Sequence, residues 1–99
     1  MSAYAIFIRD VPPHDPEGLA TYQQMNRESV PAFLQFGIAP LAVYGKIEAL
    51  EGTTPDGVII LKFPSLADAQ AWYNSPEYQA ALPHRINASE YRAFIVEGL

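Results

Sequence analysis

The sequence predicts an α+β fold, and three observations lead to that class. Short apolar runs, rich in β-branched and aromatic residues, recur along the chain and are typical of strands covered on both faces. Between them lie segments with apolar residues at helical spacing, two of which begin with an N-cap residue and a proline. Turn-forming residues separate the elements. The expected order is strand, helix, strand, strand, helix, strand, with the second helix in two pieces.

The first strand is expected at residues 4–8, which end before a charged pair and two prolines. A helix starts after Asp15, a good N-cap, and its apolar face continues to Gly37, a predicted C-terminal cap. Pro31 lies inside this pattern and removes one intrahelical hydrogen bond. We therefore predict one helix kinked near Arg27, with two shorter helices as the alternative.

The second and third strands are predicted to be antiparallel neighbours. Residues 41–44 form the core of the second strand, Gly45 marks a bulge, and residues 47–50 continue the strand. Residues 52–57 are dense in turn formers and lead to the third strand at residues 58–63. The third strand is almost wholly apolar, so we expect it to lie centrally in the sheet.

Two consecutive helices are expected next, and they meet at Trp72. Ser65 can cap the first, because an acid follows three residues later as in a capping box. Ser75, followed by a proline, can cap the second, which is expected to end near Pro83. The last strand is expected at residues 90–97, with apolar side chains on both faces.

This order of elements is the split βαβ arrangement of ferredoxin-like folds, built on one antiparallel sheet. Helices cover only one face of such a sheet, yet these strands are apolar on both faces. A second copy of the chain is the natural cover. We therefore expect a homodimer whose two sheets face each other across a two-fold axis. No linker or repeat divides residues 1–99, which we expect to form one domain.

The composition argues against several classes of function. Six basic and eleven acidic side chains give a net charge of −5, which disfavours nucleic acid and anionic membranes as partners. There is no cysteine, and the two histidines lack the spacing of metal ligands. We recognise no phosphate-binding loop, signal peptide or membrane-spanning run. The expectation is a cytoplasmic protein without a metal or another cofactor.

Several short motifs in the chain form a set: Phe63-Pro64-Ser65, Ala69-x-x-Trp72-Tyr73-x-Ser75-Pro76-x-Tyr78, the downstream Arg85, Asp15-Pro16-Glu17, Leu50-Glu51-Gly52 and Val96-Glu97-Gly98. This set resembles the bacterial family called domain of unknown function 1330, and the resemblance spans nearly the whole chain. It implies a dimeric α/β-barrel. It implies no particular reaction, because the superfamily includes cofactor-free monooxygenases, muconolactone-isomerase-like enzymes and polyketide cyclases.

The chain departs from that family at two places where members often carry an arginine. Members often have Gly-Gly-Arg after the first helix and Arg-Gly-Gly after the next strand. Here residues 37–39 read Gly-Ile-Ala and residues 43–45 read Val-Tyr-Gly, so a phenol stands in place of one arginine. If members bind carboxylates there, the departure favours a more neutral or aromatic ligand.

The candidate catalytic residues are His84, Tyr44 and Arg85, in a pocket expected between the sheet and its helices. His84 is a candidate general base because histidine titrates near neutral pH, and Arg85 could stabilise the enolate that forms. Tyr44 and Tyr22 could donate hydrogen bonds to a carbonyl oxygen. Adjacent side chains usually diverge, which counts against His84 and Arg85 sharing a pocket. The alternative is an exposed histidine and an arginine paired with a nearby glutamate.

The candidate substrate contacts are Tyr22, Trp72, Tyr78 and Arg9, and each also has a structural explanation. The tyrosines can be core residues with satisfied hydroxyls, Trp72 can pack a helix on the sheet, and Arg9 can form a salt bridge at the rim.

Two functions fit this pattern. The favoured one is a small cofactor-independent isomerase, cyclase or lyase that transfers a proton on a small carbonyl or aromatic metabolite, with a monooxygenase as a variant. The other is a dimeric small-molecule-binding or accessory protein without turnover. The direction of His84, into a cavity or into solvent, separates the two.

Overall fold

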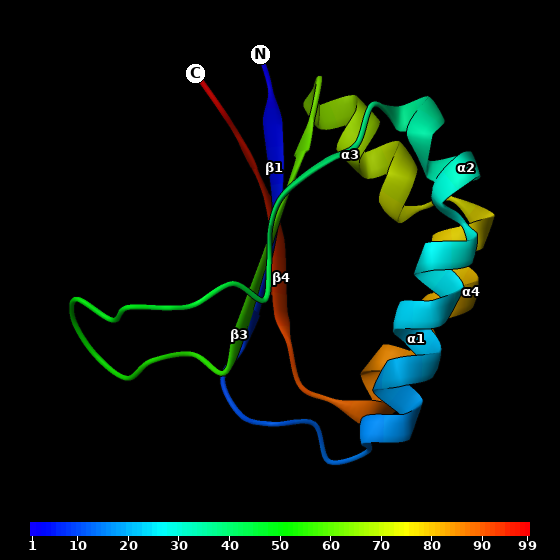
Figure 1. Cartoon of the computed structure of the whole chain (residues 1–99). Helices are drawn as coiled ribbons and strands as arrows, with labels where there is room; N and C mark the ends of the chain where they lie inside the picture. Colours follow the sequence, from blue (N-terminus) through cyan, green and yellow to red (C-terminus); the bar gives the residue numbers. More distant parts are fainter.

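A four-stranded sheet with helices on one face forms the fold, and the computed structural model describes all of residues 1–99 (Figure 1). Its elements are β1 (Ala3–Arg9), α1 (Pro16–Glu28), α2 (Val30–Phe33), the 3₁₀ helix η1 (Leu34–Phe36), β2 (Ala39–Val43), β3 (Gly57–Phe63), α3 (Leu66–Tyr73), α4 (Pro76–Ala88) and β4 (Arg92–Glu97). The strand order is β2-β3-β1-β4, and neighbouring strands are antiparallel. The fold is therefore ferredoxin-like, as predicted.

The hydrophobic core fills the space between the sheet and the helices. Alternate residues of β1 and β3 point into it, including Phe7, Leu61 and Phe63. Trp72 lies in this layer and is only 3% exposed. Its ring lies edge-on or tilted to four core rings, at centroid distances of 4.4–6.2 Å: Phe7, Phe33, Phe63 and Tyr78. The motif residue Trp72 thus packs α3 on the sheet, as the structural explanation predicts.

The other face of the sheet carries no helix (Figure 1) and is mainly apolar, with Lys62 and Arg92 as its charged residues. Ile6 lies near its middle, opposite Ile60 on one side and Phe94 on the other. The side chains on this face that are large and apolar are Tyr4, Ile6, Ile8, Val58, Ile60, Phe94 and Val96, and we call them the open face. Phe94 and Val96 are 48% and 46% exposed.

The first helix is broken rather than kinked, so the alternative of two shorter helices is correct. α1 ends at Glu28 and α2 begins at Val30, with Ser29 between them. Pro31 lies in the first turn of α2, where a missing N–H leaves no hydrogen bond unmade.

Residues 47–50 do not form the predicted strand. β2 ends at Val43, and the next residue, Tyr44, takes a positive φ of 55° that turns the chain out of the sheet. The bulge lies between Pro40 and Ala42, not at Gly45. Residues 45–56 form a long loop that projects away from the sheet on the side opposite the helices (Figure 1, left).

The prediction that the last helix ends near Pro83 is also wrong, because α4 continues to Ala88. Pro83 is exposed, so its ring faces solvent while the residues around it bury the inner side of the helix. Leu82, Arg85 and Ala88 are all buried. Packing of this side offsets the hydrogen bond that the proline removes.

Candidate functional site

A pocket of about 380 Å³ opens between α1, α2 and the strands β2 and β3. Its wall is mainly apolar, with Phe33, Ile59 and Trp72 among the lining residues. Two phenols also line it: Tyr22 from the buried side of α1, and Tyr44 from the end of β2. We call this space the helix–sheet pocket. A mainly apolar cleft with a few polar groups is the usual form of a small-molecule site.

Four residues form what we call the rim cluster: Arg9, Asp56, Tyr44 and Tyr91. The Arg9 Nε donates to Asp56 Oδ2 at 2.7 Å, and its Nη1 donates to the Tyr91 hydroxyl at 3.0 Å. The Tyr91 and Tyr44 hydroxyls are 2.6 Å apart, and the Arg9 guanidinium lies 5.0 Å from the Tyr44 ring centre. The cluster thus connects the pocket wall to a charged pair at the surface.

Three residues form the inner cluster: Tyr22, Tyr78 and Arg85. The hydroxyls of Tyr22 and Tyr78 are 2.8 Å apart and buried. Burial raises the pKa of Tyr22 and of Tyr78, and burial likewise raises the pKa of Tyr91 in the rim cluster. These phenols are therefore neutral at physiological pH and can donate hydrogen bonds, but they cannot serve as bases.

Arg85 is a buried cation without a carboxylate partner. It is 6% exposed, and the salt bridges of the protein are Arg9–Asp56 and Arg92–Asp10. Its guanidinium carbon lies 5.2–5.7 Å from the centres of three aromatic rings: Phe7, Tyr22 and Tyr91. Its Nε makes no hydrogen bond. The predicted alternative of a pair with a nearby glutamate is not formed.

Six of the seven predicted site residues gather at this interface between helices and sheet. Tyr22, Tyr44 and Trp72 line the pocket. Tyr78 and Arg85 contact Tyr22, and Arg9 contacts Tyr44.

His84 does not join them. It lies within α4, exposed to solvent, while the next residue, Arg85, points into the core. The structure therefore offers His84 no contact with the pocket, because adjacent helical side chains diverge by about 100°. His14 is exposed as well, and its Nε2 lies 2.8 Å from the carbonyl oxygen of Asn87.

Tyr91 is the site residue that sequence reasoning missed. The sequence pattern that could have identified it is the alternation of side chains along the last strand, which puts Tyr91 on the same side as Ala93 and Ile95. That alternation places Tyr91 on the helix side of the sheet, where it meets both arginines.

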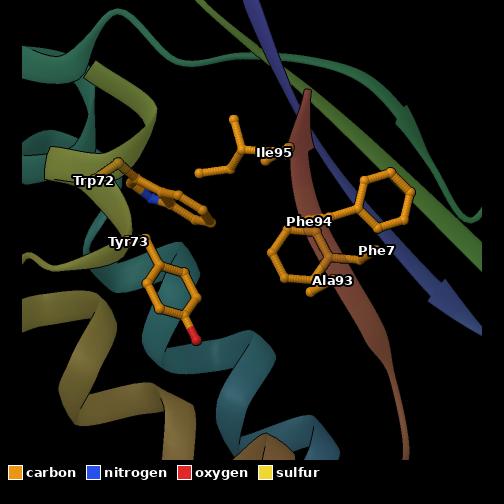
Figure 2. A pocket seen from close by; sticks show the side chains of 7 residues that line it. Phe7, Trp72, Tyr73, Ala93, Phe94 and Ile95 are labelled. Atoms are coloured by element: carbon orange, nitrogen blue, oxygen red, sulfur yellow. The ribbon is translucent and has the colours of Figure 1, made fainter. Parts of the chain in front are cut away.

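A second cavity of about 230 Å³ lies between α3 and the edge strand β4 (Figure 2). All of its lining residues are hydrophobic, and Phe7 and Trp72 line both cavities. In Figure 2 the Trp72 ring lies toward Ile95, whereas the Phe94 ring lies on the other side of β4, and its register places it on the open face. This cavity has apolar walls but no charged side chain.

No three histidine or acidic side chains lie close enough together to hold a metal ion. None of the helices is both long and apolar enough to cross a membrane.

Similar folds occur in several solved structures. A protein of unknown function from Rhodopseudomonas palustris is 23% identical over 99% of this chain and 82% of its own, with a TM-score of 0.72. A dimeric ferredoxin-like protein of unknown function from Jannaschia sp. CCS1 is 10% identical over 99% and 100%, with a TM-score of 0.70. A proposed antibiotic biosynthesis monooxygenase from Nitrosomonas europaea is 10% identical over 99% and 89%, with a TM-score of 0.56. These identities show the fold alone.

Among curated proteins, none matches the sequence. One family model does, over residues 2–99, and its description is a domain of unknown function, DUF1330.

Proposed function

This chain belongs to the domain of unknown function 1330 family, and we propose that it is a homodimeric protein that binds a small carbonyl-containing or aromatic metabolite in the helix–sheet pocket. Tyr44, assisted by Tyr22, donates a hydrogen bond to the carbonyl oxygen of the ligand. One observation carries this proposal: the Tyr44 hydroxyl is held 2.6 Å from that of Tyr91 while Tyr44 lines the pocket. A donor fixed before the ligand arrives loses little entropy on binding.

The rim cluster supports the direction of that hydrogen bond. Arg9 can only donate, so the oxygen of Tyr91 accepts from it. The Tyr91 hydrogen is then free to point at the Tyr44 oxygen, which leaves the Tyr44 hydrogen for a ligand. Each donor in such a chain strengthens the next, so the charge of Arg9 makes Tyr44 a better donor.

A cofactor-free proton-transfer enzyme, an isomerase, cyclase or lyase, is the second candidate function. The same chain of donors favours it, because donors at a carbonyl oxygen stabilise the enolate that forms when an α C–H bond breaks. No histidine or carboxylate lines the pocket, and His84 faces solvent. The released proton therefore passes to water, and turnover would rise with the concentration of a basic buffer. The name of the Nitrosomonas europaea neighbour supports a monooxygenase variant by fold analogy only.

The open face supports a homodimer that joins through the sheets. Its strands present a mainly apolar surface, with Lys62 opposite Tyr4 and Arg92 opposite Ile8 at its ends, that water would otherwise cover. Solved structures similar to this chain, from Bacteroides fragilis, Thermobifida fusca and Jannaschia sp. CCS1, are described as dimeric and ferredoxin-like. A two-fold partner placed on this face would bury both copies of Ile6 and Phe94.

Ligand-observed NMR with a library of small carbonyl and aromatic metabolites tests the pocket. The variants are Tyr44→Phe, which removes the donor and little else, and His84→Ala as a control at an exposed position. We expect ligands whose binding weakens about tenfold in Tyr44→Phe and does not change in His84→Ala. The proposed function would be contradicted if no library compound binds, or if the compounds that bind have the same affinity for Tyr44→Phe as for the native protein.

Sedimentation of Ile6→Asp tests the dimer. We expect the native protein to sediment as a dimer and the variant as a folded monomer, because a buried unpaired carboxylate would oppose the contact of two sheets. Far-ultraviolet circular dichroism confirms folding. A native monomer, or a folded variant that stays dimeric, would exclude the sheet face as the interface.

A further inference from the structure

We infer that the ligand of the helix–sheet pocket is a monoanion with an apolar body, and that Arg85 supplies the compensating positive charge. The inference rests on the proposed function and names the chemical class of its ligand. The anionic group is a carboxylate or an enolate, since both present a negatively charged oxygen to a guanidinium.

The charges inside the protein do not balance. Two guanidinium groups, those of Arg9 and Arg85, lie on the Tyr91 ring, at 5.7 and 5.2 Å from its centre. Only one carboxylate, that of Asp56, reaches this region, and Arg9 holds it at 2.7 Å. The positive charge of Arg85 therefore remains without a counter-charge.

The imbalance follows from the residue type, because arginine is a permanent cation in proteins, whereas a buried lysine can become neutral. The rings of Phe7, Tyr22 and Tyr91 attract the cation through their faces, yet they remain neutral, since burial raises the pKa of both phenols. A buried charge without a partner opposes folding, so its presence points to a partner that arrives with the ligand.

The pocket brings a ligand to within one aromatic ring of this cation. Phe7 and Tyr22 line the helix–sheet pocket, and the Arg85 guanidinium carbon lies 5.5 and 5.7 Å from the centres of their rings. An anion seated at the positive edge of the Tyr22 ring feels the charge across an apolar layer, where electrostatic attraction is stronger than in water.

The lining limits the ligand to one negative charge. Most of the pocket wall is hydrophobic, and the one basic residue that lines it, Arg27, is exposed and held by Gln24 through two hydrogen bonds. A second carboxylate would have to lie against apolar side chains without a partner. A ligand with a single negative charge agrees with the absence of the two arginines that related sequences often carry. Of the cations that could meet a ligand, Arg85 is retained.

Calorimetric titration of the whole protein with benzoate, benzamide and terephthalate tests the inference. These probes share one ring and carry one, no and two negative charges. Benzoate should bind at least about tenfold more tightly than either of the others, as expected for a charged hydrogen-bonded pair. A phenolate probe, 4-nitrophenolate, then separates the two anion classes: preference for it over benzoate indicates an enolate-like ligand.

The variant Arg85→Met keeps the length of the side chain and removes the charge. We expect it to bind benzoate and benzamide with equal affinity, whereas Lys46→Met, which removes an exposed cation outside the pocket lining, keeps the preference for benzoate. Should Arg85→Met fail to fold, Arg85→Lys replaces it, and part of the preference should survive because a cation remains.

The outcomes separate this inference from the proposed function. Equal binding of benzoate and benzamide by the native protein, or an unchanged preference in Arg85→Met, would overturn the inference and leave the pocket proposal standing. If none of the probes binds and the metabolite library has no binder either, both fail together.

Discussion

The inner cluster and the rim cluster each contain one arginine and two tyrosines, but only the arginine of the rim cluster has a carboxylate partner. In the rim cluster Arg9 has a carboxylate at 2.7 Å, and its side chain and that of Asp56 are 13% and 31% exposed. In the inner cluster Arg85 is 6% exposed and has rings where the carboxylate would be. A partner near the surface stabilises the first cation in the free protein. The second lacks such a partner, and that difference identifies the place where a ligand completes the structure.

The largest expected effect is in alkaline solution, where the inner cluster contributes two phenols with a raised pKa, Tyr22 and Tyr78, and the rim cluster contributes one, Tyr91. Burial raises the pKa of Tyr22 and of Tyr78 above the ordinary value of 10.0. Above pH 10 the unfolded chain loses protons that the folded inner cluster keeps, so the free energy of unfolding falls as pH rises. Each phenol contributes up to about 1.4 kcal/mol per pH unit, and neither affects the slope well below pH 10. Urea unfolding between pH 9 and pH 11 measures this, and the slope should lessen in Tyr78→Phe.

The substitution Arg85→Met is expected to have the next largest effect on the free energy of unfolding, and it should stabilise the protein, which is unusual for a change in the core. Replacing a buried unpaired cation with an apolar side chain should raise the free energy of unfolding by about 1–2 kcal/mol. Urea unfolding at pH 7 without ligand measures the change, and Arg9→Met in the rim cluster is the matched control, which should lose stability. A loss in Arg85→Met as large as that in Arg9→Met would mean that the three rings fully compensate the charge.

Removing one hydroxyl from each cluster sharpens the comparison further. Tyr22→Phe leaves the buried hydroxyl of Tyr78 without its partner, at a cost of about 1–2 kcal/mol. Tyr44→Phe leaves Tyr91 with Arg9 and access to water, so the loss should be about 0.5 kcal/mol. Thermal unfolding of the two variants side by side gives the order, and the reverse order would mean that the inner hydroxyls are not isolated from water.

The smallest effect is expected from the charged pair of the rim cluster. Asp56→Asn removes the charge that faces Arg9, but both groups keep access to solvent, which limits the loss to about 0.5 kcal/mol. The loss should shrink as salt is added, because screening weakens exposed pairs. A large loss that salt does not change would show that the rim cluster is as dry as the inner one.

The fold was predictable because its signals are local. Apolar runs, N-caps and turn residues determine where β1, β3 and α1 begin, and each depends on a few adjacent residues. The local predictions that failed depend on distant contacts or on the backbone. α4 passes through Pro83 because its buried side packs on the rest of the protein, and β2 ends early because Tyr44 takes a positive φ.

The sequence was enough to predict which residue types form the candidate site, but not which of these residues contact one another. Phenols and arginines could be selected because such groups bind carbonyl oxygens and anions. Their sequence separations are large: Tyr44 meets Tyr91 across 47 residues, and Arg9 meets Tyr91 across 82. Only the sheet order brings these segments together. His84 is a candidate because of its titration range and its place beside Arg85, but adjacent positions of a helix point in different directions, and only Arg85 faces inward.

The position of Trp72 gives the protein an optical reporter of its own. It is the only tryptophan of the chain, and its indole ring lies in the wall that the two cavities share. Indole emission changes in colour and intensity with the polarity and proximity of neighbouring groups. A molecule entering either cavity therefore alters the fluorescence of the unlabelled protein, so that occupancy can be followed in real time at micromolar concentration without attaching a dye.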